Sequence, residues 1–127
     1  MTSKPLFLYH PRCGTCKKAR AWLDAQGIEY REQDLTATAP TAEQLSEWKE
    51  KASAAISKMF NTSGMQYRSL GLKDKVKSAP ESELLALLST DGMLVKRPII
   101  VTPTAARFGF KENEWAELLL DRDREGI

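Results

Sequence analysis

The sequence predicts a mixed α/β domain in which a helical segment interrupts one sheet. Three observations lead to this fold class. Apolar, β-branched runs typical of strands occur near both ends of the chain, helical periodicity with capping signals fills the middle, and no repeat, low-complexity tract or linker divides the 127 residues. A chain of this length can bury a core of its own. We therefore expect one domain over residues 1–127, with the helical insertion at about 41–90.

The N-terminal part has the pattern of a strand, a helix and a second strand. The first strand is expected at residues 5–9, and the helix at about 15–26, where Gly27 ends it. The second strand is expected at residues 28–34. A strand-helix-strand unit of this length predicts a right-handed crossover between two parallel strands.

Helical signals dominate the middle of the chain. Thr41 and Ser78 each begin a capping-box pattern, Thr-Ala-Glu-Gln and Ser-Ala-Pro-Glu, with an apolar run after it. Each pattern predicts the start of a helix. Residues 54–72, between these helices, are expected to form short helices broken at residues 61–64 and again at Gly71.

Strands return near the C-terminus. Residues 93–95 and 99–102 are apolar and partly β-branched, and residues 106–108 are expected to pair back as a hairpin after the turn Pro103-Thr104. A last helix begins near Lys111. A β-α-β half, a helical insertion and a β-β-α half around one mixed sheet form the architecture of thioredoxin-like folds.

The motif Cys13-Gly14-Thr15-Cys16 holds the two cysteines of the chain and lies where the first strand runs into the first helix. A helix N-terminus favours an anion, because its unpaired N–H groups and the positive end of the helix dipole point there. Arg12 precedes Cys13 directly, and the C-x-x-C spacing itself lowers the pKa of the first thiol. We expect Cys13 to be the nucleophile and Cys16, one turn on, to close a disulfide with it.

Other interpretations of these residues stay open. The cysteines are either a redox couple or a structural pair, and a cytosolic C-x-x-C is more often catalytic. A zinc site needs four ligands, and His10 is the single histidine, so no metal is expected within one chain. His10 either pairs with the Cys13 thiolate or is a half-exposed turn residue.

The charge balance and hydropathy exclude several classes of protein. The net charge is +2, which indicates neither a nucleic-acid-binding protein nor one that binds a membrane surface. No segment approaches the roughly 18 consecutive apolar residues of a membrane span, and the N-terminus lacks the apolar region of a signal peptide. We expect a cytoplasmic protein, in a compartment where thiols are kept reduced.

Four segments match a known family in its order and over most of the chain: residues 9–23 around the C-x-x-C motif, 60–72, 97–101 and 109–111. On these segments the sequence resembles the arsenate reductase (ArsC-like) family of thioredoxin folds. That family also contains the Spx-type transcription regulators and related reductase-like proteins.

The resemblance implies a set of site residues. Cys13 is the nucleophile, and Arg97-Pro98 lies beside it with Pro98 in a cis peptide bond. Arg97 is expected to bind an oxyanion or to stabilise the Cys13 thiolate through its planar set of donors; the alternative is an arginine that only forms a surface ion pair. The other expected binding residues are Arg12, Gly14, Thr15, Asn61, Arg68 and Pro98.

The sequence departs from the pattern of arsenate reductases, in which three arginines surround the arsenate. Only Arg97 is retained here, because Asn61 and Phe110 stand at the other two positions. Arg68 and Arg107 lie nearby in sequence, and each is either a substitute for a missing arginine or an ordinary solvated arginine. The loss of two arginines weakens arsenate as the natural substrate. Asn61 either lines the dithiol cleft or belongs to a local cap and turn.

The sequence thus predicts a thiol-disulfide oxidoreductase of the ArsC-like family that uses a Cys13/Cys16 couple on a small oxyanion, arsenate included, or on a disulfide. Glutathione, glutaredoxin or thioredoxin would restore the dithiol, and no other cofactor is implied. The alternative is an Spx-like redox-sensing regulator that binds the C-terminal domain of the RNA polymerase α subunit. Cys16 fits both functions, because Spx-like members carry C-x-x-C as a redox switch.

Overall fold

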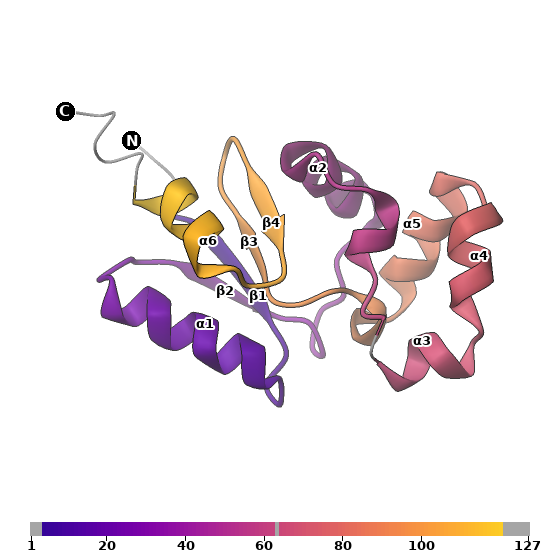
Figure 1. Cartoon of the computed structure of the whole chain (residues 1–127), viewed down its shortest axis with the longest axis horizontal. Coiled ribbons are helices and arrows are strands. Elements are labelled where there is room, and N and C mark those ends of the chain that lie inside the picture. The colour runs from indigo at the N-terminus through magenta and orange to yellow at the C-terminus, as the bar shows by residue number, and fades with distance from the viewer. Residues whose placement is uncertain (1–3, 63, 121–127) are drawn as a thin grey trace.

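The computed structural model of the chain describes residues 4–62 and 64–120 (Figure 1). Four strands form a sheet in the order β2-β1-β3-β4. They are β1 (Leu6–Tyr9), β2 (Arg31–Asp34), β3 (Ile99–Val101) and β4 (Ala106–Phe108). β1 pairs parallel with β2 and antiparallel with β3, and β3 and β4 form the expected hairpin. The predicted mixed sheet of a thioredoxin-like fold is confirmed.

The two central strands are buried on both faces, because their alternate side chains enter two different cores. Phe7 and Ile100 point to the face covered by α1 (Gly14–Ala25) and α6 (Glu112–Leu119). Leu8 and Ile99 point to the opposite face, which the helical insertion covers. Continuous apolar runs are the pattern expected of strands covered on both faces.

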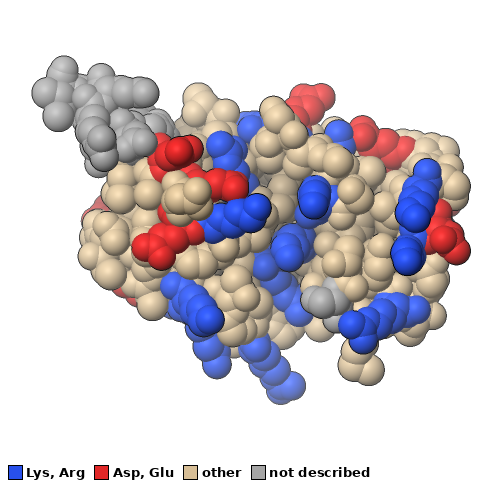
Figure 2. Space-filling view, in the orientation of Figure 1, with Lys and Arg blue, Asp and Glu red and all other residues tan. Residues whose placement is uncertain are grey.

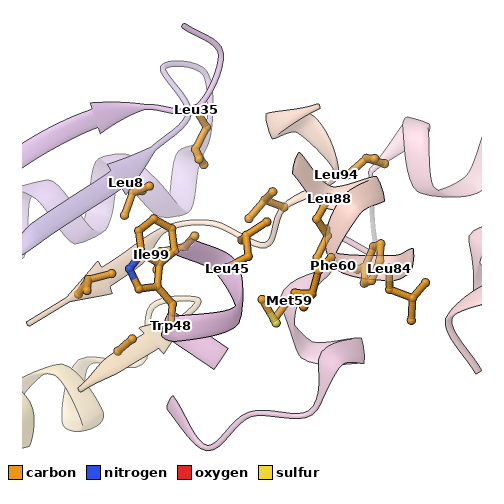
Figure 3. Close-up of a cluster of buried hydrophobic side chains, with 14 of the residues drawn as sticks. Leu8, Leu35, Leu45, Trp48, Met59, Phe60, Leu84, Leu88, Leu94 and Ile99 are labelled. Carbon is orange, nitrogen blue, oxygen red and sulfur yellow. The ribbon is translucent and has the colours of Figure 1, made fainter. Parts of the chain in front are cut away.

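The helical insertion contains five short helices beside the sheet (Figure 1). They are α2 (Ala42–Ala52), η1 (Ile56–Met59), α3 (Met65–Ser69), α4 (Leu72–Ser78) and α5 (Glu81–Thr90). Figure 3 shows Trp48 of α2 beside the strand residues Leu8 and Ile99, and Leu45 of α2 between them and the α5 leucines Leu84 and Leu88. Breaks fall near residues 61–64 and at Gly71, as predicted. Gly71 has a φ of 62°, a conformation that favours glycine.

One of the two predicted capping boxes forms. The Thr41 hydroxyl accepts a hydrogen bond from the backbone N–H of Gln44 (3.1 Å), and the Gln44 side chain accepts one from the Thr41 N–H (3.0 Å). The box predicted at Ser78 was wrong. Ser78 is the last residue of α4, its hydroxyl donates to the Asp74 carbonyl (3.1 Å), and Pro80 precedes α5 without a side-chain cap.

Two strand predictions also need correction. Residues 93–95 do not form a strand, because the Asp91 carboxylate accepts a hydrogen bond from the Met93 N–H (2.8 Å) and starts a 3-10 turn, η2 (Gly92–Leu94). Val95 keeps a single bridge, to Phe60. β2 begins at Arg31, three residues later than expected, since residue 28 still donates its N–H to the end of α1.

Gly92, at the start of η2, lies very close to the backbone of Leu35, which is far from it in sequence. A Cβ at this position would lie 2.1 Å from the backbone oxygen of Leu35, which follows β2. Both residues are buried, so neither segment has room to move. None of the described helices has the length and apolar character needed to cross a membrane.

Gly92→Ala is expected to lower the free energy of unfolding by about 1–3 kcal/mol, the usual cost of overpacking a buried site. Denaturant unfolding measures the effect. Gly14→Ala is the matched control, since no atom lies within 4 Å of a Cβ there. A Gly92→Ala protein as stable as the wild type would contradict the close approach to Leu35.

Candidate active site

Cys13 is the N-cap of α1. Its backbone is extended (φ −84°, ψ 119°), and its Sγ accepts a hydrogen bond from the backbone N–H of Cys16 (3.3 Å). The Cys13 carbonyl accepts the first bond of the helix, from the Lys17 N–H (3.1 Å). The sulfur therefore occupies the position that a serine or aspartate oxygen takes at most helix N-termini. Because Cys13 is half-buried, its sulfur can meet a substrate and is partly shielded from water.

Cys16 lies one turn further on and faces the interior. Only 2% of its surface is exposed, and its Sγ accepts a hydrogen bond from the backbone N–H of His10 (3.5 Å). Both cysteines are free thiols in this structure. The predicted pair is therefore brought together in its reduced form, with one accessible sulfur and one buried sulfur.

The two thiols ionise unequally. Burial opposes ionisation of Cys13, but hydrogen bonds from the Cys16 thiol and N–H, together with Arg97, lower its pKa below the usual 9.0. Burial, with a smaller contribution from the neighbouring sulfur of Cys13, raises the pKa of Cys16 to about 12. The arrangement therefore favours a thiolate at Cys13 and a protonated thiol at Cys16.

Arg97 is the cation closest to this chemistry. It precedes Pro98, and the peptide bond between them is cis, as the resemblance implied. The half-buried guanidinium donates to the Met93 carbonyl (3.4 Å) and stabilises the negative form of Cys13. No carboxylate in the described part of the chain forms an ion pair with Arg97, so its charge stays available for an anion.

His10 organises the turn before the helix. Its carbonyl accepts the Cys13 N–H (3.1 Å), and its Nδ1 accepts the Arg12 N–H (3.0 Å). Burial and the nearby charge of Arg97 lower the pKa of His10, which favours a neutral imidazole at pH 7. The Arg12 side chain itself is exposed.

The remaining predicted residues differ in how closely they approach the dithiol. Gly14 and Thr15 form the exposed first turn of α1. The Asn61 N–H donates to the Leu94 carbonyl (2.8 Å), which holds Asn61 against the end of η2, three residues before Arg97. Arg68 lies exposed on α3, and no hydrogen bond or ion pair joins it to the dithiol among the described residues.

Neither Phe110 nor Arg107 restores the missing arginines. The Phe110 ring packs against Trp115 and Trp22, with ring centres 4.9 and 6.1 Å apart. Arg107 instead pairs with Glu114 (3.8 Å) and lies opposite Ile100 in the middle of β4. Arg97 is thus the one arginine of the expected three that contacts the dithiol.

A shallow pocket of about 260 Å³ next to Cys16 was not predicted. Tyr9, His10 and Arg20 line it with Cys16. The Arg20 guanidinium lies 4.7 Å from the centre of the Tyr9 ring and pairs with Glu32. Arg20 lies four residues after Cys16 in the sequence, and this spacing is the signal that would have placed Arg20 on the same helix face as Cys16.

Comparisons with known proteins identify the family of this chain. The model of the ArsC family matches residues 8–118. The uncharacterised protein YusI of Bacillus subtilis is 43% identical over 111 residues, covering 87% of this chain and 94% of YusI. The crystal structure of an ArsC family related protein from Bacteroides fragilis has a TM-score of 0.88 and 43% identity, covering 91% of this chain and 98% of that chain.

A regulator is also among the relatives. The global transcriptional regulator Spx of Listeria monocytogenes is 26% identical over 114 residues, covering 90% of this chain and 86% of Spx. The family resemblance read from the C-x-x-C, 60–72, 97–101 and 109–111 segments is confirmed.

Cys13 is expected to react with iodoacetamide much faster than Cys16 in the folded protein. Because the Cys13 thiolate is the reactive form, its rate should rise with pH to a plateau whose midpoint lies below 9.0, whereas Cys16, with a pKa of about 12, stays unmodified. Peptide mapping by mass spectrometry at several pH values measures both rates. Equal rates at the two cysteines would contradict the proposed asymmetry.

Arg97→Ala is expected to raise the pKa of Cys13, because the variant removes a positive charge that stabilises the thiolate. The midpoint of the alkylation profile should move to higher pH. Arg12→Ala is the control, since that side chain is exposed and does not contribute to the Cys13 shift. An unchanged midpoint in Arg97→Ala would remove Arg97 from the site.

Proposed function

Because the chain belongs to the ArsC family, we propose that it is a thiol-disulfide oxidoreductase whose redox couple is Cys13 and Cys16. The observation that carries the proposal is the unequal ionisation of two free thiols in one helical turn, one half-buried and one buried. A structural pair would not need this difference.

The first step is attack on a substrate disulfide. The Cys13 thiolate attacks one sulfur of the substrate, a mixed disulfide forms on Cys13, and the other substrate sulfur leaves as a thiolate. Arg97 lies beside the sulfur that carries the negative charge at the start of this step. The positive end of the α1 dipole acts in the same direction.

The second step is resolution by Cys16. Formation of the mixed disulfide removes the negative charge from Cys13, and that charge is one of the causes that hold the Cys16 pKa high. Cys16 therefore loses its proton more readily at this stage than in the resting protein. Its thiolate attacks the Cys13 sulfur, the Cys13–Cys16 disulfide forms, and the second half of the substrate leaves as a thiolate.

A disulfide suits the site better than arsenate as the substrate. Only Arg97 and the helix N-terminus are available to an oxyanion, whereas Phe110 stands in an aromatic cluster at one of the expected arginine positions. A disulfide needs no set of three cations, because its charge appears on one leaving sulfur. Two molecules of glutathione, or one dithiol protein such as glutaredoxin or thioredoxin, would reduce the intrachain disulfide in the cytoplasm.

Cys13→Ser is expected to reduce turnover of bis(2-hydroxyethyl) disulfide to the uncatalysed rate. Cys16→Ser should retain the first step and accumulate the mixed disulfide when no donor is present, because nothing resolves it. Intact mass spectrometry detects this adduct in Cys16→Ser and a loss of two hydrogens in the wild type. Arsenate is assayed in parallel, and turnover that persists in Cys13→Ser would contradict the mechanism.

The second candidate function is an Spx-like regulator that binds the C-terminal domain of the RNA polymerase α subunit. The Spx relative favours it, as does a C-x-x-C motif able to switch between dithiol and disulfide. Capture of the isolated α C-terminal domain by the reduced and oxidised chain separates the two candidates. Redox-dependent capture without turnover of any disulfide would replace the enzyme with the regulator.

A further inference from the structure

A second concave site lies away from the dithiol, and its lining is basic. This basic groove has a volume of about 360 Å³, and its charged lining consists of Lys58, Lys96, Arg107, Lys111 and Glu114. Figure 2 shows lysine and arginine side chains gathered across the middle of the face between the α6 side of the molecule and the helical insertion. The whole chain has a net charge of only +2, so this local excess of positive charge is not a property of the surface in general.

Two of the lysines lack a carboxylate partner. Within the described part of the chain neither Lys58 nor Lys96 forms an ion pair, although Lys49, Lys51 and Lys75 all do. The four cations come from η1, the segment after η2, β4 and the start of α6, so the tertiary fold brings them together. Unpaired like charges that share a groove repel one another, and an anionic ligand would relieve that repulsion.

The form of the groove favours carboxylates over a compact phosphate. The Arg107 guanidinium already donates to the Ala106 carbonyl (2.7 Å) and pairs with Glu114, so its fork is not free to hold a phosphate. Glu114 pairs with both Arg107 and Lys111, so Lys58 and Lys96 are the cations of the described lining that stay available to a ligand. The cations that remain are lysines, which act as separate point charges.

The groove also has apolar walls. The half-buried Phe108 lines it, together with Ala52 at the end of α2 and Ala54 after that helix. A ligand that fits must therefore carry both carboxylates and an apolar side chain.

We propose that the basic groove binds a short acidic segment of a partner protein, with an apolar side chain of that segment against Phe108. This inference does not depend on the redox function, because none of the residues that line the groove hydrogen-bonds to Cys13 or Cys16 among the described residues. Lys58 and Lys96 attract the carboxylates of this segment electrostatically.

The probe is a fluorescein-labelled peptide, Glu-Asp-Leu-Glu-Asp-Leu, with the amide peptide Gln-Asn-Leu-Gln-Asn-Leu as its uncharged counterpart. Fluorescence anisotropy should show binding of the acidic peptide that weakens as salt is raised from about 50 to 300 mM, because salt screens exposed charges. The Lys58→Gln/Lys96→Gln variant should bind it about tenfold more weakly. Lys73→Gln/Lys77→Gln, which removes the same charge from the exposed side of α4, should stay within about twofold of the wild type.

Four results would overturn the proposal. They are no binding of the acidic peptide, equal binding of the amide peptide, an equal loss in both lysine variants, and tighter groove-dependent binding of tripolyphosphate or of a single-stranded oligonucleotide. Since the readout is binding and needs no turnover, failure of the redox mechanism leaves this test unaffected. Circular dichroism verifies that both lysine variants are folded.

Discussion

Burial of the Cys16 sulfur against the backbone of His10 is the contact on which the site depends. It directs one cysteine of the pair inward and leaves the other at the helix N-cap, where the N–H of Cys16 meets the sulfur of Cys13. Because a buried thiol resists ionisation and an N-cap favours an anion, the two sulfurs of one helical turn differ in how readily they ionise. The attacking and resolving roles follow from this difference in environment, since the side chains are chemically identical.

The segment from Gly92 to Pro98 connects this turn to the rest of the molecule. Gly92 packs on the backbone of Leu35, Val95 bridges to Phe60, and Arg97 then reaches the dithiol. Residues far apart in the chain thereby control the position of one guanidinium. The helical insertion contributes to the site through this segment, because the Asn61 N–H donates to the carbonyl of Leu94 at the end of η2.

The distribution of charge separates two regions of one small molecule. Near Cys13, Arg97 is a single half-buried cation beside a sulfur, which suits a reaction in which charge appears on one atom. In the basic groove, four cations, of which Lys58 and Lys111 are exposed and Lys96 and Arg107 half-buried, share an open surface with an aromatic ring, which suits recognition. Lys96 and Arg97 are neighbours in sequence but belong to different regions. A partner bound in the basic groove would therefore contact the same chain segment that carries Arg97 to the dithiol.

The sequence by itself determined the order of the elements, the C-x-x-C at a strand-to-helix turn, the Thr41 capping box and the family, because these depend on residues close together in the chain. Predictions from the sequence were wrong where a local pattern is compatible with two different structures. Ser78 ended one helix when its pattern suggested the start of the next, and residues 93–95 turned at Asp91 when their apolar character suggested a strand. Only the tertiary structure decided which sulfur is buried, that Phe110 fills an aromatic cluster, that Arg20 lies over Tyr9, and that four distant cations line one groove. Burial and the summed field of charges depend on segments that meet in space, and their spacing along the chain does not encode them.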